Sequence, residues 1–171
     1  MKNFIKNAKD SFVPAMTETV DKMADKVRDT AENLTKQDGN LINKSGDVSQ
    51  NPNAKGFAFE HTQEATFNAN AERLGQPYEA IRVPPKGIED LNDKRGLDLP
   101  TERLGEPDIV IINTDTGEVV KTYQAKIGSE DYIKTSVNDE KYSDTDAFVV
   151  NSENADVAAQ YNNVSTVLEY D

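Results

Sequence analysis

The chain has 171 residues, no cysteine and one histidine, and its formal net charge at pH 7 is −12. The absence of cysteine excludes disulfides and thiolate metal sites, and a single histidine argues against a histidine-based zinc site or a Ser-His triad. No apolar run approaches the ~20 residues that a membrane span needs, and the N-terminus lacks the apolar core of a signal peptide. We therefore expect a soluble protein without a membrane partner that is made in the cytoplasm. Delivery into another cell stays open.

Residues 1–37 are predicted to form a long N-terminal amphipathic helix. Apolar residues recur every three or four positions over 3–36 and form a narrow stripe, which either packs on the rest of the chain or pairs with a partner helix or a second copy. Pro14 is expected to kink this helix or to mark a start near residue 13. Residues 38–55 are rich in Gly, Asn, Ser and Asp, and we predict that they form a linker.

Residues 56–171 are predicted to form one α/β domain with a small mixed sheet flanked by helices. A helix over 57–74 should end at Gly75, with Pro77 just beyond it. The remaining expected elements are strands over 78–83, 108–113, 118–127, 146–151 and 164–170, a long loop over 84–107, a short helix within 129–143, and a helix over 152–162 that Ser152 caps.

The segment NTDTGE between two predicted strands is typical of a hairpin. A three-residue loop over 115–117 requires a left-handed residue at its end, which Gly117 supplies. This turn sets the register of the paired strands. The predicted pairs are Thr114 with Glu118, Ile112 with Val120, Val110 with Thr122, and Asp108 with Gln124.

Three polar side chains are predicted to converge at the open end of this hairpin. Side chains alternate along a strand, so Lys126 shares a face with Gln124, and the register places Asp108 opposite Gln124. Two interpretations stay open here: the three residues either face water at the strand ends or form part of a functional site.

Two carboxylates lie in line with the apolar stripe of the helix predicted over 57–74. Glu60 and Glu64 follow the same three- and four-residue steps as the stripe, and burial of a carboxylate is costly unless it is paired or bound to a cation. They either reach a basic side chain such as Arg82 or Lys126, or help to bind a metal. The stripe itself consists of Phe57, Phe67, Ala71 and Leu74.

Together these residues make up the minimum set for metal-assisted phosphodiester hydrolysis. Carboxylates on Glu60 and Asp108 and the carbonyl oxygen of Gln124 are ligands for a hard divalent ion that keeps several waters. A neighbouring lysine, Lys126, can orient a water or stabilise charge that develops on phosphorus.

The segment EPDIVIINTDTGEVVKTYQAK resembles the motif of the PD-(D/E)XK nucleases, in the variant that has Gln in the second acidic position. The upstream KGFAFEHTQEATFNANA is similar to the helix that supplies an additional glutamate in that family. Nuclease domains of this kind occur in mobile elements, phages and polymorphic toxins. The resemblance covers roughly residues 55–151 and implies a restriction endonuclease-like core.

The resemblance also implies roles for particular residues. Asp108 would be the main metal ligand, Gln124 the altered acidic position and Lys126 the catalytic lysine. The main-chain carbonyl of Ala125 would complete the shell of a Mg²⁺ or Mn²⁺ ion. Glu60 would assist the metal or a water, and Glu64 could compensate for the charge that is missing at Gln124. The resemblance gives His61 no role.

Three functions are compatible with the sequence. The first is a Mg²⁺-dependent nuclease, acting on DNA in preference to RNA. The second is a non-enzymatic acidic protein on a nuclease-like fold, which mimics nucleic acid or inhibits a basic partner. Residues 41–171 carry twelve Lys/Arg against twenty-four Asp/Glu, and this excess favours the second function, because phosphate binding normally needs clustered cations. The third is a structural or regulatory domain of a longer system.

Overall fold

The structure is a computed structural model that describes residues 54–170. The predicted helix over 1–37 and the linker up to residue 53 lie outside the described residues. The helices are α2 (Ala54–Leu74), α3 (Ile88–Arg95), α4 (Glu130–Val137) and α5 (Ala155–Ala158), with short 3-10 helices η1 (Glu140–Tyr142) and η2 (Ser152–Asn154). The strands are β1 (Tyr78–Arg82), β2 (Ile109–Asn113), β3 (Val119–Lys126), β4 (Ala147–Val150) and β5 (Val164–Ser165).

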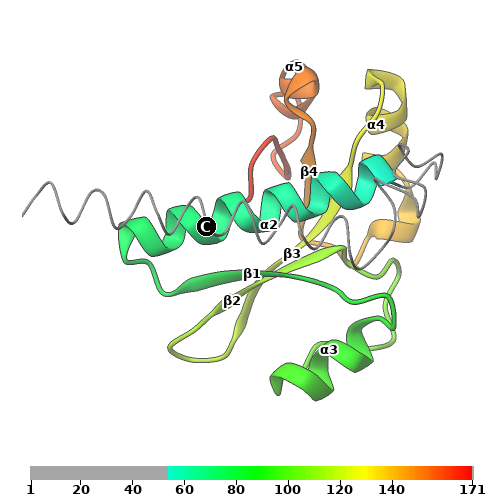
Figure 1. The fold of residues 1–171 in the computed structure, drawn as a ribbon. Coiled ribbons are helices and arrows are strands. Elements are labelled where there is room, and N and C mark those ends of the chain that lie inside the picture. Colours follow the sequence, from blue (N-terminus) through cyan, green and yellow to red (C-terminus); the bar gives the residue numbers. More distant parts are fainter. Residues whose placement is uncertain (1–53, 171) are drawn as a thin grey trace, which may run out of the picture.

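The five strands form one mixed sheet in the order β1-β2-β3-β4-β5. The first three strands are antiparallel neighbours, whereas β4 is parallel to β3 and β5 is parallel to β4. Helices flank the sheet, with α2 running along it and α3 on the far side of β1 and β2 (Figure 1). The predicted α/β class with a mixed sheet between helices is therefore confirmed.

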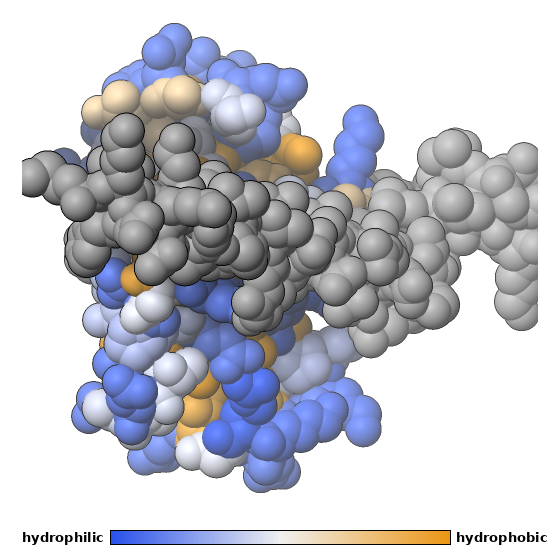
Figure 2. All heavy atoms as spheres, turned by 60° about the vertical axis from the view of Figure 1, so that its left-hand side comes forward, coloured by the Kyte–Doolittle hydropathy of each residue, from blue (hydrophilic) through white to orange (hydrophobic). Residues whose placement is uncertain are grey.

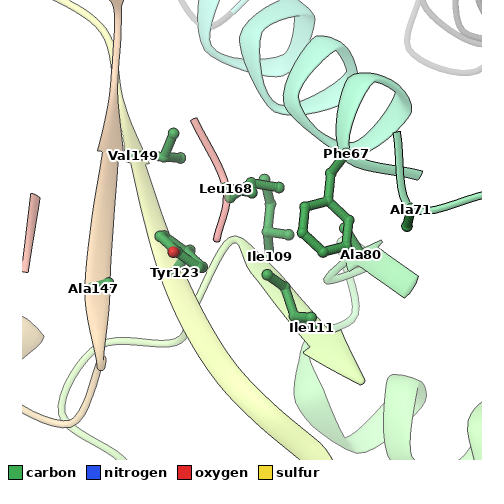
Figure 3. Close-up of a cluster of buried hydrophobic side chains, with 9 residues drawn as sticks. All are labelled: Phe67, Ala71, Ala80, Ile109, Ile111, Tyr123, Ala147, Val149 and Leu168. Atoms are coloured by element: carbon green, nitrogen blue, oxygen red, sulfur yellow. The ribbon is translucent and has the colours of Figure 1, made fainter. Parts of the chain in front are cut away.

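Alternation along the strands gives the sheet two apolar faces. The face under α2 carries Ile109 and Ile111 of β2, Tyr123 of β3 and Val149 of β4, and Phe67 of α2 packs against them (Figure 3). The opposite face carries the intervening residues. There Val110 packs with α3, and two residues of β4 pack with α4 and α5; these are Phe148 and Val150.

Helix α2 begins three residues earlier than predicted, at Ala54, and ends where Gly75 was predicted to end it. Gly75 has φ +64, its N–H donates to the Glu72 carbonyl, and the next N–H, of Gln76, donates to the Ala71 carbonyl. This pair of bonds closes the last turn of the helix in the left-handed arrangement that glycine favours.

The apolar stripe of α2 was predicted only in part. Phe67 and Ala71 are buried as predicted, but Leu74 is 57% exposed because it is the last helical residue before the chain turns away at Gly75. Phe57 is half-buried, and Phe59, which the stripe did not include, packs against the core under α2.

The predicted loop over 84–107 contains helix α3, so this prediction was wrong. Ile88 and Leu91 lie one turn apart and are buried against Val110. Burial of these two side chains stabilises the short helix. The α3 N-terminus is satisfied by the Glu106 carboxylate, which accepts from the Ile88 N–H across 18 residues of sequence. Local sequence patterns do not reveal such a distant cap.

The prediction of a strand over 164–170 was also wrong, because only Val164–Ser165 pairs in the sheet. The following residues turn onto the α2 side. There Tyr170 stacks on Tyr78 with ring centroids 4.2 Å apart and meets Phe67 edge-on at 6.3 Å. The Tyr123 hydroxyl donates to the Glu169 carbonyl and accepts from the Glu169 N–H, each at 3.0 Å. Packing against α2 thus replaces further strand pairing.

The helix predicted over 152–162 is shorter than expected and divided into η2 and α5. Residue Ser152 is the first residue of η2 and not its cap; Asn151 holds that position. The short helix expected within 129–143 is confirmed as α4, and Ser129 caps it by accepting from the Tyr132 N–H. Within residues 54–170 we find no helix with the length and hydropathy that crossing a bilayer requires. Hydrophilic residues cover most of the coloured surface in Figure 2.

Candidate functional site

The hairpin between β2 and β3 closes with a different turn from the predicted one. Asn113, not Thr114, pairs with Glu118, and the Asn113 side-chain oxygen accepts from the N–H groups of Asp115 and Thr116 at 2.9 and 3.2 Å. The loop therefore has four residues, held by a local asparagine turn. Gly117 has φ +73, so the predicted left-handed glycine is present.

A bulge in β3 restores the predicted register beyond the turn. Ile112 pairs with Val119 and not with Val120 as predicted, whereas Ile111 pairs with Lys121, so Val120 is the extra residue. The longer loop and the bulge shift the register in opposite directions and cancel. Val110 pairs with Thr122 as predicted, and Ile109 pairs with Tyr123 in the same register. Asp108 lies beyond these pairs, and its N–H donates to the Tyr123 carbonyl at 2.8 Å.

Asp108 lies at the open end of the hairpin, directly before β2 and after the fully buried Pro107. Its Oδ2 accepts from the Ala125 N–H at 2.8 Å and lies 3.6 Å from Lys126 Nζ. Burial raises the pKa of the Asp108 carboxyl above its ordinary value, and the Lys126 ammonium and the Ala125 N–H oppose that rise. The side chain keeps 29% of its surface exposed, so solvent reaches it.

Gln124 is almost completely buried, with 2% of its surface exposed. Its Nε2 donates to the Glu106 carbonyl, and its Oε1 accepts from Lys126 Nζ at 2.8 Å. The Gln124 amide is thus bonded through both its nitrogen and its oxygen, and Glu106 links it to the N-terminus of α3. In this arrangement Gln124 holds the lysine.

Lys126 is enclosed by three partners and has 12% of its side chain exposed. Besides Gln124 and Asp108, its ammonium lies 4.7 Å from the centre of the Tyr142 ring, a distance at which a cation is attracted to the ring face. Tyr142 in turn packs edge-on against Phe148, with centroids 5.8 Å apart. The predicted convergence of Asp108, Gln124 and Lys126 is therefore confirmed as geometry.

The two helical glutamates lie on α2 beside a single arginine of β1. Arg82 Nη1 is 3.8 Å from Glu60 Oε2, and Arg82 Nε is 3.8 Å from Glu64 Oε2. Glu64 also accepts from the Arg82 main-chain N–H at 3.0 Å. Burial raises the pKa of Glu64, while its bond to the Arg82 N–H and the Arg82 charge lower it. Of the two interpretations of these glutamates, the structure contains the pairing with Arg82.

A cleft of about 800 Å³ opens between the start of α2 and the end of β3. Glu60 borders it on one side, Ala125 and Lys126 on the other, and Tyr132 of α4 also lines it. Of the residues that the structure describes, neither Asp108 nor Glu64 is part of the lining. The predicted site residues therefore divide into a set at the cleft and a set next to it.

Oxygen atoms at the cleft and next to it are of the chemical type that a hard divalent ion binds. Mg²⁺ is commonly held by one or two carboxylates, with waters in its other positions. Glu60, Asp108 and the Ala125 carbonyl are donors of this kind. Over residues 54–170, however, no three Asp, Glu or His side chains are grouped so that they could hold an ion by themselves.

Some residues of this region did not stand out in the sequence. His61 is buried, at 4% exposure, with Nδ1 3.8 Å from Glu64 Oε2. Glu106 accepts from the Gln124 amide, and the Tyr142 ring lies under the Lys126 ammonium. Glu106 comes from the segment predicted as a loop and Tyr142 from the segment predicted to contain a short helix. Tyr142 is one of two tyrosines in the largely polar stretch over 129–143, and this was the available signal for it.

Comparisons of the chain with protein-family models, with curated proteins and with solved structures found no match.

Proposed function

We propose that this chain is a metal-dependent nuclease of the PD-(D/E)XK type that hydrolyses phosphodiester bonds, with DNA preferred over RNA. The order of the main elements supports this proposal: helix α2, the antiparallel strands β1 to β3 with α3 inserted between β1 and β2, helix α4, and strand β4 parallel to β3. This is the order expected of a restriction endonuclease-like core. The resemblance gives roles to Glu60 on α2, to Asp108 directly before β2 and to Lys126 at the end of β3, and Lys126 lies 3.6 Å from Asp108.

The observation that carries the proposal is the placement of Lys126. Its ammonium lies 2.8 Å from the Gln124 amide oxygen and 3.6 Å from the Asp108 carboxylate, and its side chain borders the cleft that Glu60 borders from α2. A lysine so enclosed is held in one position without being removed from the cleft. Positioning of this kind is what a catalytic group requires.

Each residue has a chemical task in this proposal. Asp108, Glu60 and the Ala125 carbonyl would hold Mg²⁺ or Mn²⁺, which when bound polarises the phosphate and lowers the pKa of a bound water. Lys126 would orient the attacking water or stabilise the negative charge that develops on the phosphate oxygens. Gln124 orients Lys126 through its amide oxygen. Glu64, which the resemblance offered as an accessory ligand, has its carboxylate paired to Arg82 and is given no metal in this proposal.

The test is a nuclease assay on DNA and on RNA across a titration with Mg²⁺ and Mn²⁺, run beside an Asp108→Ala control. We expect cleavage that needs the metal and is lost in the variant, together with calorimetric evidence of metal binding. Unchanged metal-dependent cleavage in the Asp108→Ala variant would refute the assigned site. Absence of both binding and cleavage in the unaltered protein would refute the activity.

A second function, a non-enzymatic acidic binding protein, is favoured by the state of Gln124. The amide is neutral, buried and engaged on both sides, so it adds no charge to a metal site. Together with the net charge of −12, this is compatible with a protein that occupies the groove of a basic partner. Such a protein would bind polycations in a salt-sensitive manner and would not respond to Mg²⁺.

A further inference from the structure

An exposed aromatic ring stands beside the proposed catalytic lysine. Tyr132, in the first turn of α4, lines the same cleft as Lys126 and is 48% exposed. Ile127, which follows Lys126, also lines the cleft and is 38% exposed. The wall of the cleft next to the lysine therefore presents apolar surface to solvent.

Buried polar side chains hold the main chain on which the Tyr132 ring rests. A Cβ added at Gly128 would lie 2.6 Å from Tyr132 Cδ1, so the ring packs directly on the glycine backbone. The Gly128 N–H donates to Asn151 Oδ1 at 3.3 Å, and the Gly128 carbonyl accepts from Asn154 Nδ2 at 2.9 Å. Both asparagines are buried and bonded to each other at 2.8 Å. Tyr132 is thus supported by a fixed loop.

Charges around the cleft suit one phosphate backbone better than two. Among residues 54–170, the basic residues of the lining are Lys55 and Lys126, and the acidic ones are Glu60 and Glu153. Duplex DNA carries one negative charge per about 1.7 Å of its axis, twice the density of one of its strands. A cleft with this balance, in a chain of net charge −12, repels a duplex more strongly than a single strand.

We propose that this cleft binds an unpaired nucleotide of single-stranded nucleic acid, with the base stacked on Tyr132 and the phosphate directed to Lys55 and Lys126. The inference rests on the proposed nuclease function and specifies its substrate. The cleft volume of about 800 Å³ lies within the range of roughly 300–1,000 Å³ that is usual for pockets that enclose a small ligand. Base stacking on an aromatic side chain tolerates any base, so the preference is for strandedness and not for sequence.

The test measures binding without cleavage. A fluorescein-labelled oligothymidylate, alone or annealed to oligoadenylate, is titrated with the full chain in EDTA at low salt, and anisotropy is recorded. We expect tighter binding of the single strand than of the duplex. Replacement Tyr132→Ala should weaken single-strand binding by about 5- to 150-fold, the range that stacking of one base supports. Replacement Tyr132→Phe keeps the ring and should stay within about twofold of the unaltered protein.

A second variant, Gly128→Ala, tests whether the position of the Tyr132 ring matters for binding when the ring itself is kept. Gly128→Ala pushes the Tyr132 ring away from its support, so single-strand binding should weaken although the tyrosine remains. Equal binding by the Tyr132→Ala variant, or a preference for the duplex, would overturn the inference. Because no metal or cleavage enters this assay, its failure is distinct from failure of the proposed hydrolysis, which the Asp108→Ala comparison reports.

Discussion

Two groups of polar side chains lie near the same cleft, and in each a basic side chain is paired in a different way. On α2 and β1, Glu60 and Glu64 share Arg82, whose planar guanidinium has enough donors to reach both at 3.8 Å. At the end of the β2–β3 hairpin, Asp108 shares Lys126 with a neutral amide, that of Gln124. We call these the arginine group and the lysine group.

The difference between the two groups indicates a structural role for the arginine group and a chemical role for the lysine group. An arginine stays protonated and binds carboxylates through a rigid fork, which suits a structural pair at the sheet edge. A lysine carries its charge at a single point, and here an amide and an aromatic ring hold that point beside the partly exposed Asp108. We infer that the arginine group mainly holds α2 on β1, whereas the lysine group acts on substrate.

Removal of the lysine is expected to have the largest effect. In Lys126→Ala, metal-dependent cleavage should fall by about 10²- to 10⁴-fold, the usual contribution of a positioned proton-transfer group. Initial rates at saturating Mg²⁺ provide the measurement. Lys121→Ala, on the same strand but beside Tyr123, is the matched control and should keep its rate. Equal cleavage rates for the two variants would show that Lys126 is not a catalytic residue.

Removal of the arginine should instead affect stability. Arg82→Ala leaves two largely buried carboxylates without their shared cation, and we expect the free energy of unfolding to fall by about 1–3 kcal/mol. Urea denaturation followed by circular dichroism measures this change. The control is Arg95→Ala, which removes an exposed pair with Glu79 and should lower the free energy of unfolding by less than about 1 kcal/mol. If both variants are equally stable, the arginine group is not structural.

Neutralisation of each helical glutamate tests whether the arginine group also contributes to catalysis. Glu60 borders the cleft and Glu64 does not, so Glu60→Gln should weaken the apparent Mg²⁺ affinity by about tenfold, while Glu64→Gln should leave it nearly unchanged. The Mg²⁺ dependence of the cleavage rate gives both values. The reverse order would make Glu64 the accessory ligand.

A smaller effect concerns the protonation of Asp108. Burial raises the pKa of its carboxyl, and the Lys126 ammonium counteracts that rise, so Lys126→Ala should raise the pKa further. Because the carboxylate is the form that binds metal, the acid limit of metal binding should move to higher pH. A ¹³C NMR titration of the Asp108 carboxyl without metal measures the pKa directly, with Lys121→Ala as control. A lower pKa in Lys126→Ala would contradict the pairing.

The two ends of the β2–β3 hairpin differ in how well the sequence predicted them. At the turn, Asn113 forms a side-chain bond that lengthens the loop, and no strand pattern reveals this choice. At the open end, Asp108, Gln124 and Lys126 meet as predicted, because the bulge at Val120 cancels the error in the turn. The correct site thus follows partly from two compensating local features.

Residues whose partners lie far along the chain were not predictable from local patterns. Helix α3 has only two core residues, and its N-terminus is satisfied by Glu106, which comes after the helix in a segment without regular structure. Tyr170 continues an apparent strand pattern, yet stacking on Tyr78 holds it against the α2 side. In both cases contacts between distant segments outweigh local propensity.

By itself the sequence determined most of the helices and strands, the presence of the hairpin and the polar residues at its open end, because these depend on periodicity and turn chemistry over a few neighbours. Only the tertiary structure decided that Arg82 pairs with both helical glutamates and that the Gln124 amide donates to the Glu106 carbonyl. It also decided that Tyr132 lines the cleft beside Lys126. The physical reason is that charge pairing and burial depend on which segments the fold brings together, and those segments are far apart in the chain.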